Sequence, residues 1–155
     1  MEKTDNFLIK RLLWKADKYK LPTKSSFLFK DLSPYMQQYL ISYIQPKYSG
    51  PPVLFFTKPT NEWTLICTRQ VICNDNKSTI AIEISNITSF TPTVLETSSN
   101  PTLLSYREGN HKKSEWHELT VVDKEDRRYI LHADKGPDLF SLWNILIMAK
   151  RLLTE

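Results

Sequence analysis

The sequence predicts an α+β protein in which about seven short antiparallel strands form a barrel or sandwich that a C-terminal helix caps. Three observations lead to this fold class. Apolar residues alternate from residue 53 onward, turn residues separate these runs at hairpin spacing, and the last run of the chain is helical in pattern. Two more helices are expected in a basic N-terminal extension, residues 1–50, before the break at Ser49-Gly50-Pro51-Pro52. With 155 residues, we expect a single domain.

The C-terminal run, residues 136–153, carries the clearest helix signals. Pro137 suits the first helical position, and Asp138 places negative charge at the helix start. Its apolar residues share one wide face, which predicts that the helix presses into an apolar interior. They are Leu139, Leu142, Trp143, Leu146, Ala149 and Leu153, with Ile145, Met148 and Leu152 widening the face. We expect Trp143 to plug the end of the barrel.

Residues 5–20 predict a first helix with an apolar side and a basic side. The apolar side carries Leu8, Ile9, Leu12, Leu13, Ala16 and Tyr19. Candidate contacts to a partner or an anionic membrane are Phe7, Lys10, Arg11, Trp14, Lys15 and Lys18. The alternative, which we favour, is that Phe7 and Trp14 pack against the following segment and the lysines form a solvated face.

A second helix is expected between Ser33, a good N-cap, and Pro46, which stops it. This region is rich in tyrosine, and the candidate contact residues are Tyr35, Tyr39 and Tyr43. Exposed tyrosines would suit a protein interface, although core packing is their more common fate.

The strands and turns of the remainder follow from period-two runs and from residues that tolerate turn geometry. A short strand is expected at 25–29, and later strands at 53–57, 63–67 with 71–73 after a corner, 80–84, 87–90 after a bulge or kink, 103–107, 116–122 and 128–132. Turns are expected at 58–61, 74–77, 108–111 and 123–126, and a loop at 91–100.

Residues 53–153 resemble the pleckstrin-homology-like superfold, especially its bacterial and GRAM-type members. The first piece that carries the likeness is the Trp63–Ile72 run, an apolar strand, a Thr-Arg pair and a second apolar strand. The second is the Ile82–Phe90 segment, in which polar residues separate isoleucines. The third is the terminal helix with its central Trp143, similar to the helix that plugs the barrel in that superfold.

The resemblance implies a binding platform rather than an enzyme. Members that bind phosphoinositides carry a cluster of Lys and Arg around the first hairpin. Here that hairpin, Phe56–Trp63, has one lysine, and Glu62 offsets it. The resemblance therefore does not extend to inositol-phosphate binding.

The sequence offers no catalytic, cofactor or metal site. It has three glycines and no Gly-rich phosphate loop. The nearest metal cluster is His111 and His117 with Glu115 and Glu118, but strand alternation sends Glu118 to the opposite face from His117. We expect Cys67 and Cys73 to be buried, reduced thiols, and His132 to be a hydrogen-bonded structural residue.

Charge is concentrated in the first third of the chain. Residues 1–50 hold nine Lys/Arg and four Asp/Glu, a balance of +5, whereas residues 51–155 hold twelve and thirteen, a balance of −1. The first hypothesis is a non-catalytic binding module that recognises a partner protein, for example a small inhibitor or immunity-type protein. The alternative is peripheral binding to anionic lipid through the first helix. Nucleic-acid binding ranks lower, because no nucleic-acid module signature is present.

The expected location is the cytoplasm. No stretch of about 18 apolar residues exists, and Lys10-Arg11 interrupts the apolar pieces near the N-terminus. The contact surfaces expected from the sequence are the second helix, the 91–113 region and the first helix.

Overall fold

The strands form two antiparallel sheets in the computed structural model, which describes residues 3–97 and 115–155. The larger sheet has the order β1 (Ser26–Leu28), β2 (Pro52–Thr57), β3 (Trp63–Cys67), β4 (Gln70–Asn74) and β5 (Thr79–Glu83). The smaller sheet has the order β6 (Ile87–Pro92), β7 (Glu118–Asp123) and β8 (Arg128–His132). Within each sheet, every strand pairs with the next strand along the chain, and every pair is antiparallel.

The helices are α1 (Asp5–Lys18), α2 (Pro34–Ile41), α3 (Pro46–Ser49), α4 (Thr93–Thr97) and α6 (Pro137–Thr154). Two short 3-10 helices, η1 (Phe29–Asp31) and η2 (Ile84–Asn86), lie between them. The expected α+β class, the two N-terminal helices and the C-terminal helix are confirmed. The expected strand at 103–107 and residue His111 lie outside the described residues.

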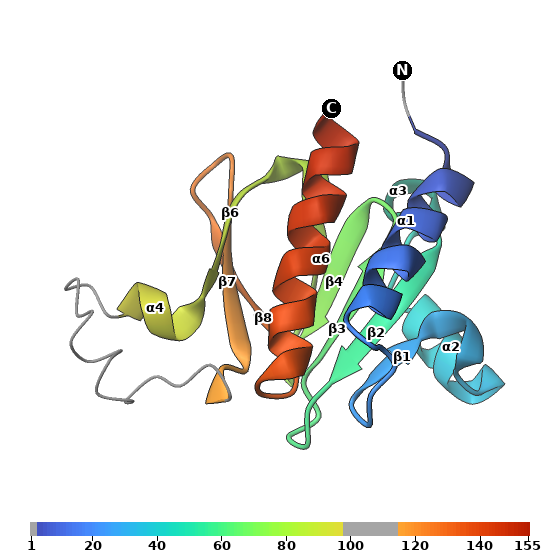
Figure 1. The fold of residues 1–155 in the computed structure, drawn as a ribbon, viewed down its shortest axis with the longest axis horizontal. Coiled ribbons are helices and arrows are strands. Elements are labelled where there is room, and N and C mark those ends of the chain that lie inside the picture. Colours follow the sequence, from blue (N-terminus) through green and yellow to red (C-terminus); the bar gives the residue numbers. More distant parts are fainter. Residues whose placement is uncertain (1–2, 98–114) are drawn as a thin grey trace.

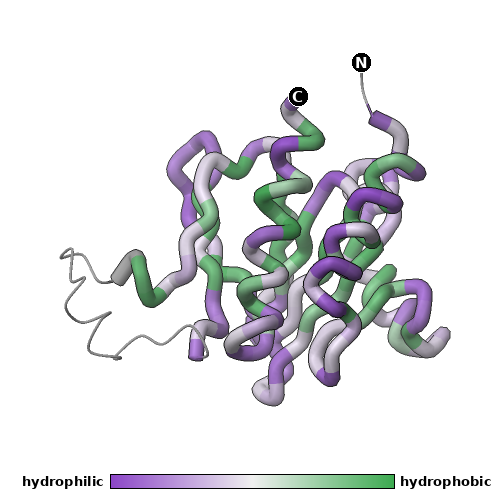
Figure 2. The backbone as a smooth tube through the Cα atoms, viewed as in Figure 1, coloured by the Kyte–Doolittle hydropathy of each residue, from purple (hydrophilic) through white to green (hydrophobic). Residues whose placement is uncertain are grey.

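Helices α1 and α6 lie side by side on one face of the larger sheet (Figure 1). Strand alternation directs Phe56, Ile66 and Val71 toward these helices, where they form the main core with Leu12 of α1 and Leu146 of α6. Helix α6 also contacts β6 and β7, so it lies between the two sheets. Figure 2 shows dense hydrophobic colouring along these strands and along α6. The N-terminal extension therefore packs into the same core as the strands.

Helix α2 covers the opposite face of the larger sheet. The alternate strand residues, among them Phe55, Leu65 and Ile72, pack against Leu40 and Ile44 in a second cluster. Ser33 caps the helix as expected, accepting a hydrogen bond from the backbone N–H of Met36. This second cluster is the smaller of the two, and α2 with the segments on either side of it covers that face.

The two sheets do not close into the barrel that was one of the two forms expected. The kink expected before residue 87 is the 3-10 helix η2, which carries the chain from β5 into the smaller sheet. The two sheets also meet at β8, which accepts hydrogen bonds from two side chains of the larger sheet. Thr64 Oγ1 donates to the carbonyl of His132 at 2.6 Å, and Cys73 Sγ donates to the carbonyl of Ile130 at 3.2 Å.

Helix α6 buries most of the expected face, but Trp143 is not the central plug. Leu142, Ile145 and Leu146 are fully buried, whereas Trp143 is only partly buried. Its indole Nε1 donates to the carbonyl of Phe90 at 3.1 Å. Trp143 therefore packs at the margin of the core, where it ties α6 to β6.

Three of the four expected turns are hairpin connections, and the fourth, at 108–111, lies outside the described residues. The loop expected from residue 91 is instead the end of β6 and helix α4 as far as Thr97. Asn61, Asn76 and Asp126 adopt positive φ angles of 76°, 75° and 62°, and each lies in a hairpin connection. Both cysteines are buried and free, as expected. No helix within the described ranges is long and apolar enough to cross a bilayer.

Candidate functional site

Helix α1 exposes the two aromatic residues that we expected to be covered. Leu8, Leu12 and Ala16 are buried, but Phe7 is 41% exposed and Trp14 is 44% exposed. The favoured prediction of packing against the following segment is therefore wrong for both rings. The reason is that the buried stripe at i, i+4 and i+8 already fills the contact with the core, which leaves the Phe7 and Trp14 side of the helix to solvent.

Cations gather around the exposed Trp14 ring. The guanidinium carbon of Arg11 lies 4.3 Å from the ring centroid, and the Nζ atoms of Lys18 and Lys15 lie 4.8 Å and 6.0 Å from it. These are cation–π distances. The structure therefore brings Arg11, Trp14, Lys15 and Lys18 together on one helical face. Lys10 is exposed.

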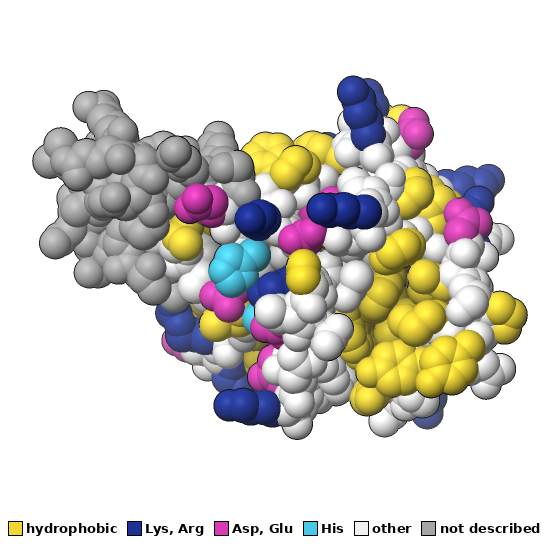
Figure 3. Space-filling model, turned by 90° about the horizontal axis from the view of Figure 1, so that it is seen from below, with side chains coloured by type: hydrophobic (Ala, Val, Ile, Leu, Met, Phe, Trp, Pro, Cys, Tyr) yellow, Lys and Arg dark blue, Asp and Glu magenta, His cyan; other side chains and the backbone are white. Residues whose placement is uncertain are grey.

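Helix α2 and the residues after it expose a second aromatic surface. Tyr35, Tyr39 and Tyr43 follow one another at four-residue steps, next to the buried stripe of α2. Tyr35 is 79% exposed, and Tyr39 and Tyr43 are each 38% exposed. We call these residues, with Ile41 and Tyr48, the tyrosine surface. Figure 3 shows a broad hydrophobic area on the side of the molecule where α2 lies.

The tyrosine surface rests on a buried aromatic layer. Tyr43 and Tyr39 meet the Trp63 ring edge to face, with centroids 5.5 Å and 6.3 Å away, and Phe55 lies 6.0 Å from Trp63. Trp63 is buried, and its Nε1 has no hydrogen-bond partner among the described residues. Edge-to-face contacts between rings are favourable, so the outer tyrosines rest on a packed aromatic base.

A third feature is a buried lysine that the sequence did not single out. Lys58 is only 8% exposed, and its Nζ lies 2.9 Å from Nδ1 of His117 and 3.0 Å from Nδ1 of His132. Oε2 of Glu62 lies 3.8 Å from the same Nζ. We call these four residues the Lys58 cluster. No local pattern predicts it, because Lys58 belongs to the β2–β3 hairpin of one sheet and the histidines to the ends of β7 and β8 in the other.

The charge in the Lys58 cluster fixes the state of its histidines. A Lys ammonium only donates, so Nδ1 is the acceptor in both contacts. Burial and the charge of Lys58 lower the pKa of His132, which keeps it neutral. For Glu62, burial acts in the opposite direction, but hydrogen bonds and Lys58 prevail and lower the pKa. The expectation of a hydrogen-bonded structural His132 is confirmed.

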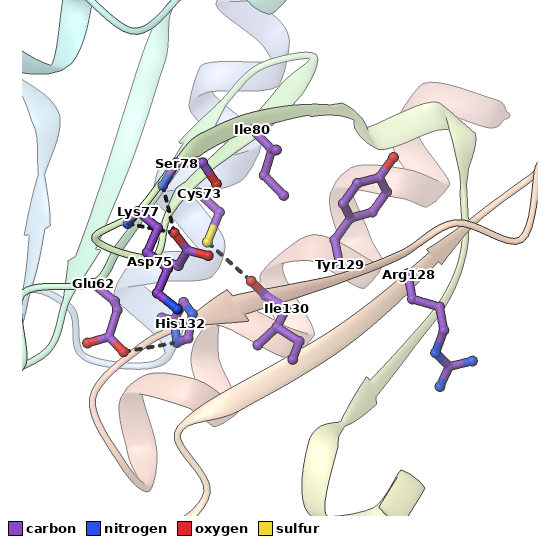
Figure 4. A pocket seen from close by; sticks show the side chains of 10 residues that line it. All are labelled: Glu62, Cys73, Asp75, Lys77, Ser78, Ile80, Arg128, Tyr129, Ile130 and His132. Atoms are coloured by element: carbon purple, nitrogen blue, oxygen red, sulfur yellow. Dashed lines mark hydrogen bonds and ion pairs between the residues drawn. The ribbon is translucent and has the colours of Figure 1, made fainter.

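Next to the cluster, the two sheets part and leave a cleft of about 450 Å³. One wall is β8 with Tyr129 and Ile130, and the other is the β4–β5 hairpin with Cys73 and Ile80, as Figure 4 shows. Polar groups lie toward its ends. They are Glu62, Asp75, Lys77, Ser78, Arg128 and His132.

The cleft does not carry the chemistry of an activated nucleophile. Burial raises the pKa of Cys73, which lines it, to about 12, so the thiol remains protonated at neutral pH. Burial also raises the pKa of Cys67 to about 12. Within residues 3–97 and 115–155, no three His, Cys, Asp or Glu side chains converge as metal ligands. The arrangement can hold a molecule by shape, hydrogen bonds and charge.

No family model, curated protein or solved structure matches the chain. The surfaces of this molecule are therefore what indicates its function.

Proposed function

We propose that the protein is a non-catalytic binding module that recognises a partner protein through the tyrosine surface. The proposal rests on the exposure of large hydrophobic side chains on this part of the molecule. Five of the ten large hydrophobic residues exposed among the described ones fall between Tyr35 and Tyr48. Tyrosine is enriched in protein interfaces, because its side chain buries a large area and can still form a hydrogen bond.

The charge of the surrounding sequence favours an acidic partner. Residues 18–61 contain six lysines and a single acidic residue, Asp31. Lys58 is buried, but Lys18, Lys20, Lys24, Lys30 and Lys47 are exposed. Of these, Lys47 lies at the tyrosine surface, with its Nζ 5.4 Å from the Tyr48 ring centroid. Positive charge beside an apolar surface attracts an acidic protein surface and speeds its approach. A small intracellular inhibitor or immunity-type protein, which holds an acidic target, is one concrete form of this function.

A pleckstrin-homology-like architecture is part of the proposal. It is supported by the order of elements after Gly50: a four-strand meander from β2 to β5, a three-strand meander from β6 to β8, and the helix α6. The helices α1 and α2, which precede this order, supply both exposed aromatic surfaces. We therefore expect the partner to bind the N-terminal helices, which precede the pleckstrin-homology-like order of elements.

Site-specific photo-crosslinking tests the proposed surface. A benzoylphenylalanine is placed at Tyr39 or, as a matched control, at the similarly exposed Phe140 of α6. In the cells that make the protein, we expect one discrete crosslinked protein from position 39 and none from position 140. The same adducts from both positions, or none from position 39, would refute the proposal.

Binding to an anionic membrane through α1 is a second candidate function. It is favoured by the exposed Trp14 ring, with Arg11 and Lys18 over it, because amphipathic aromatic and cationic groups suit a headgroup layer. Sedimentation with phosphatidylserine vesicles tests it, with Trp14→Ala against Phe140→Ala. This function requires binding that high salt and Trp14→Ala both abolish. If the wild-type protein stays in the supernatant at low salt, the candidate is excluded.

A further inference from the structure

Hydrogen bonds at the end of β8 hold the two sheets together. Thr64 Oγ1 accepts a hydrogen bond from the N–H of His132 at 3.0 Å and donates one to its carbonyl at 2.6 Å. The Lys58 ammonium lies 3.0 Å from Nδ1 of His132 and 2.9 Å from Nδ1 of His117. We call these four residues the sheet junction. Thr64 and Lys58 belong to β3 and to the hairpin before it, and the histidines lie at the ends of β8 and β7, so the junction bridges the two sheets.

The junction depends on the protonation state of His132. Its Nδ1 accepts from the Lys58 ammonium only while that nitrogen carries no proton. A protonated imidazole has a donor at both ring nitrogens and a positive charge. At 3.0 Å from Nζ it would therefore oppose the ammonium with like charge and offer it no acceptor. Nδ1 of His117 contacts the same ammonium at 2.9 Å, so the same conflict applies to it.

Glu62 supplies one carboxylate to the junction. Its Oε2 lies 3.8 Å from Nζ of Lys58 and 4.0 Å from Nδ1 of His132. Although burial opposes it, hydrogen bonds and the charge of Lys58 lower the pKa of Glu62. In the closed junction, this negative charge offsets the Lys58 ammonium. After protonation of His132, the same single charge would have to offset two cations.

Charged groups on the neighbouring elements also act on His132. Glu118 of β7 and Asp75 of the β4–β5 hairpin favour its protonated form. Lys77 and Arg128, which line the cleft together with His132, carry positive charge. Burial and the charge of Lys58 outweigh the carboxylates and lower the pKa of His132. The closed junction therefore favours the neutral imidazole.

An open junction would have the opposite preference. Exposure to water and separation from Lys58 would return the pKa of His132 toward its ordinary value of about 6.5. The open form then binds more protons than the closed form, so acid shifts the equilibrium toward it. Helix α6 packs against η2, β6 and β7 through apolar residues, and apolar contacts do not depend on pH. Acid therefore acts on the junction and leaves the packing of α6 between the sheets in place.

We infer that the sheet junction is an acid-sensitive switch that opens the cleft between the two sheets. Protonation of His132 separates the end of β8 from Lys58 and Thr64, and the cleft widens at that end while the apolar core around α6 stays folded. Protonation of a histidine is a common trigger of such changes below neutral pH. The junction shares no residue with the tyrosine surface, so the switch stands or falls independently of the proposed function.

The two buried cysteines provide a reporter and an internal control in the wild-type chain. Cys73 lines the cleft, and its thiol donates to the carbonyl of Ile130 on β8 at 3.2 Å. Cys67 is buried in the second cluster, on the face of the larger sheet that α2 covers. Both thiols are free. Opening of the junction exposes Cys73 alone, whereas global unfolding exposes both cysteines.

Labelling with dithiodipyridine, read by mass spectrometry of each cysteine peptide, tests the switch. The rate at each cysteine is divided by its rate in the urea-unfolded chain at the same pH, which gives its accessibility. Between about pH 7 and pH 5, the accessibility of Cys73 should rise about tenfold, since uptake of one proton changes the opening equilibrium by at most about tenfold per pH unit. The accessibility of Cys67 should stay constant. An equal rise at both cysteines, or no rise at Cys73, would overturn the inference.

The variant His132→Asn then tests whether His132 is the sensor. The amide oxygen of Asn can accept from Lys58 but does not titrate in this range. In this variant, with its fold checked by circular dichroism, the accessibility of Cys73 should no longer change with pH. A rise as large as that of the wild-type protein would show that His132 does not operate the junction.

Discussion

At the scale of single residues, the Lys58 cluster is the feature with the clearest physical signature. The contact between the Lys58 ammonium and Nδ1 of His132 forms only while His132 is unprotonated. The pKa of His132 is lowered in the folded protein, so the unfolded chain binds more protons as the pH falls below about 6.5. The stability that unprotonated His132 gives the folded protein is therefore fully present above about pH 6.5, and it is lost as the pH falls toward the lowered pKa of His132.

Lys58→Met tests this linkage. Removing the ammonium should lower the free energy of unfolding at pH 8 by about 1–3 kcal/mol, because the two Nδ1 acceptors lose their donor. It should also raise the pKa of His132, so that acid destabilises the variant less steeply than the wild type. Urea unfolding between pH 5 and pH 8 and imidazole NMR titration measure both effects, with the exposed Lys77→Met as control. An unchanged His132 pKa would mean that Lys58 does not set it.

Gly50 is a second residue whose identity the structure explains. Its φ is 68°, and an added Cβ would overlap Oγ1 of Thr68, which also donates to Asp5 at the start of α1. Gly50→Ala should cost more than about 1 kcal/mol in denaturant unfolding. The cost should be smaller in a Thr68→Ala background, where the overlapping atom is absent. Equal costs in the two backgrounds would show that the backbone conformation, not the overlap, decides the penalty.

At the scale of elements, local patterns predicted most of the fold. Period-two runs and turn residues located β2 to β5 and β8, and capping signals located the starts of α2 and α6. The predicted end of α2 is wrong, because α2 ends at Ile41 and Pro46 begins α3. Periodicity alone could not show how far each face is covered. The same spacing that buries Leu40 places Tyr39 beside it, and only the number of elements packed on that face decides that Tyr39 is exposed. The exposed Trp14 was missed for the same reason.

Helix α6 gives a test of the predicted core face. Leu146 is fully buried and the adjacent Ile147 is 39% exposed. Leu146→Ala should lower the free energy of unfolding by about 2–5 kcal/mol, because it removes packed methyl groups and leaves a cavity. Ile147→Ala, with nearly the same loss of side chain, should change it by less than about 1 kcal/mol. Equal losses in the two variants would contradict the packing described for α6.

At the scale of the whole molecule, the sequence left open the relation between the two sheets. How the two sheets sit together is decided by the 3-10 helix η2 and by long-range hydrogen bonds of Thr64, Cys73 and Lys58. The two residues that each of these hydrogen bonds joins are 57 to 74 residues apart along the chain. Such contacts leave no periodic signal. The predicted barrel or sandwich is therefore two joined sheets with a cleft between them, and the exposed aromatic surfaces lie on the N-terminal helices.

The central claim is that the tyrosine surface recognises a partner protein. Its most direct test is the affinity of the purified protein that crosslinks from position 39. Tyr39→Ala and Tyr43→Ala should each weaken binding by about 2 kcal/mol or more, as anchors at the centre of an interface do. The control Phe140→Ala should leave the affinity within about twofold, since a side chain outside the interface contributes little. Full affinity in both tyrosine variants, each shown to be folded, would contradict the account.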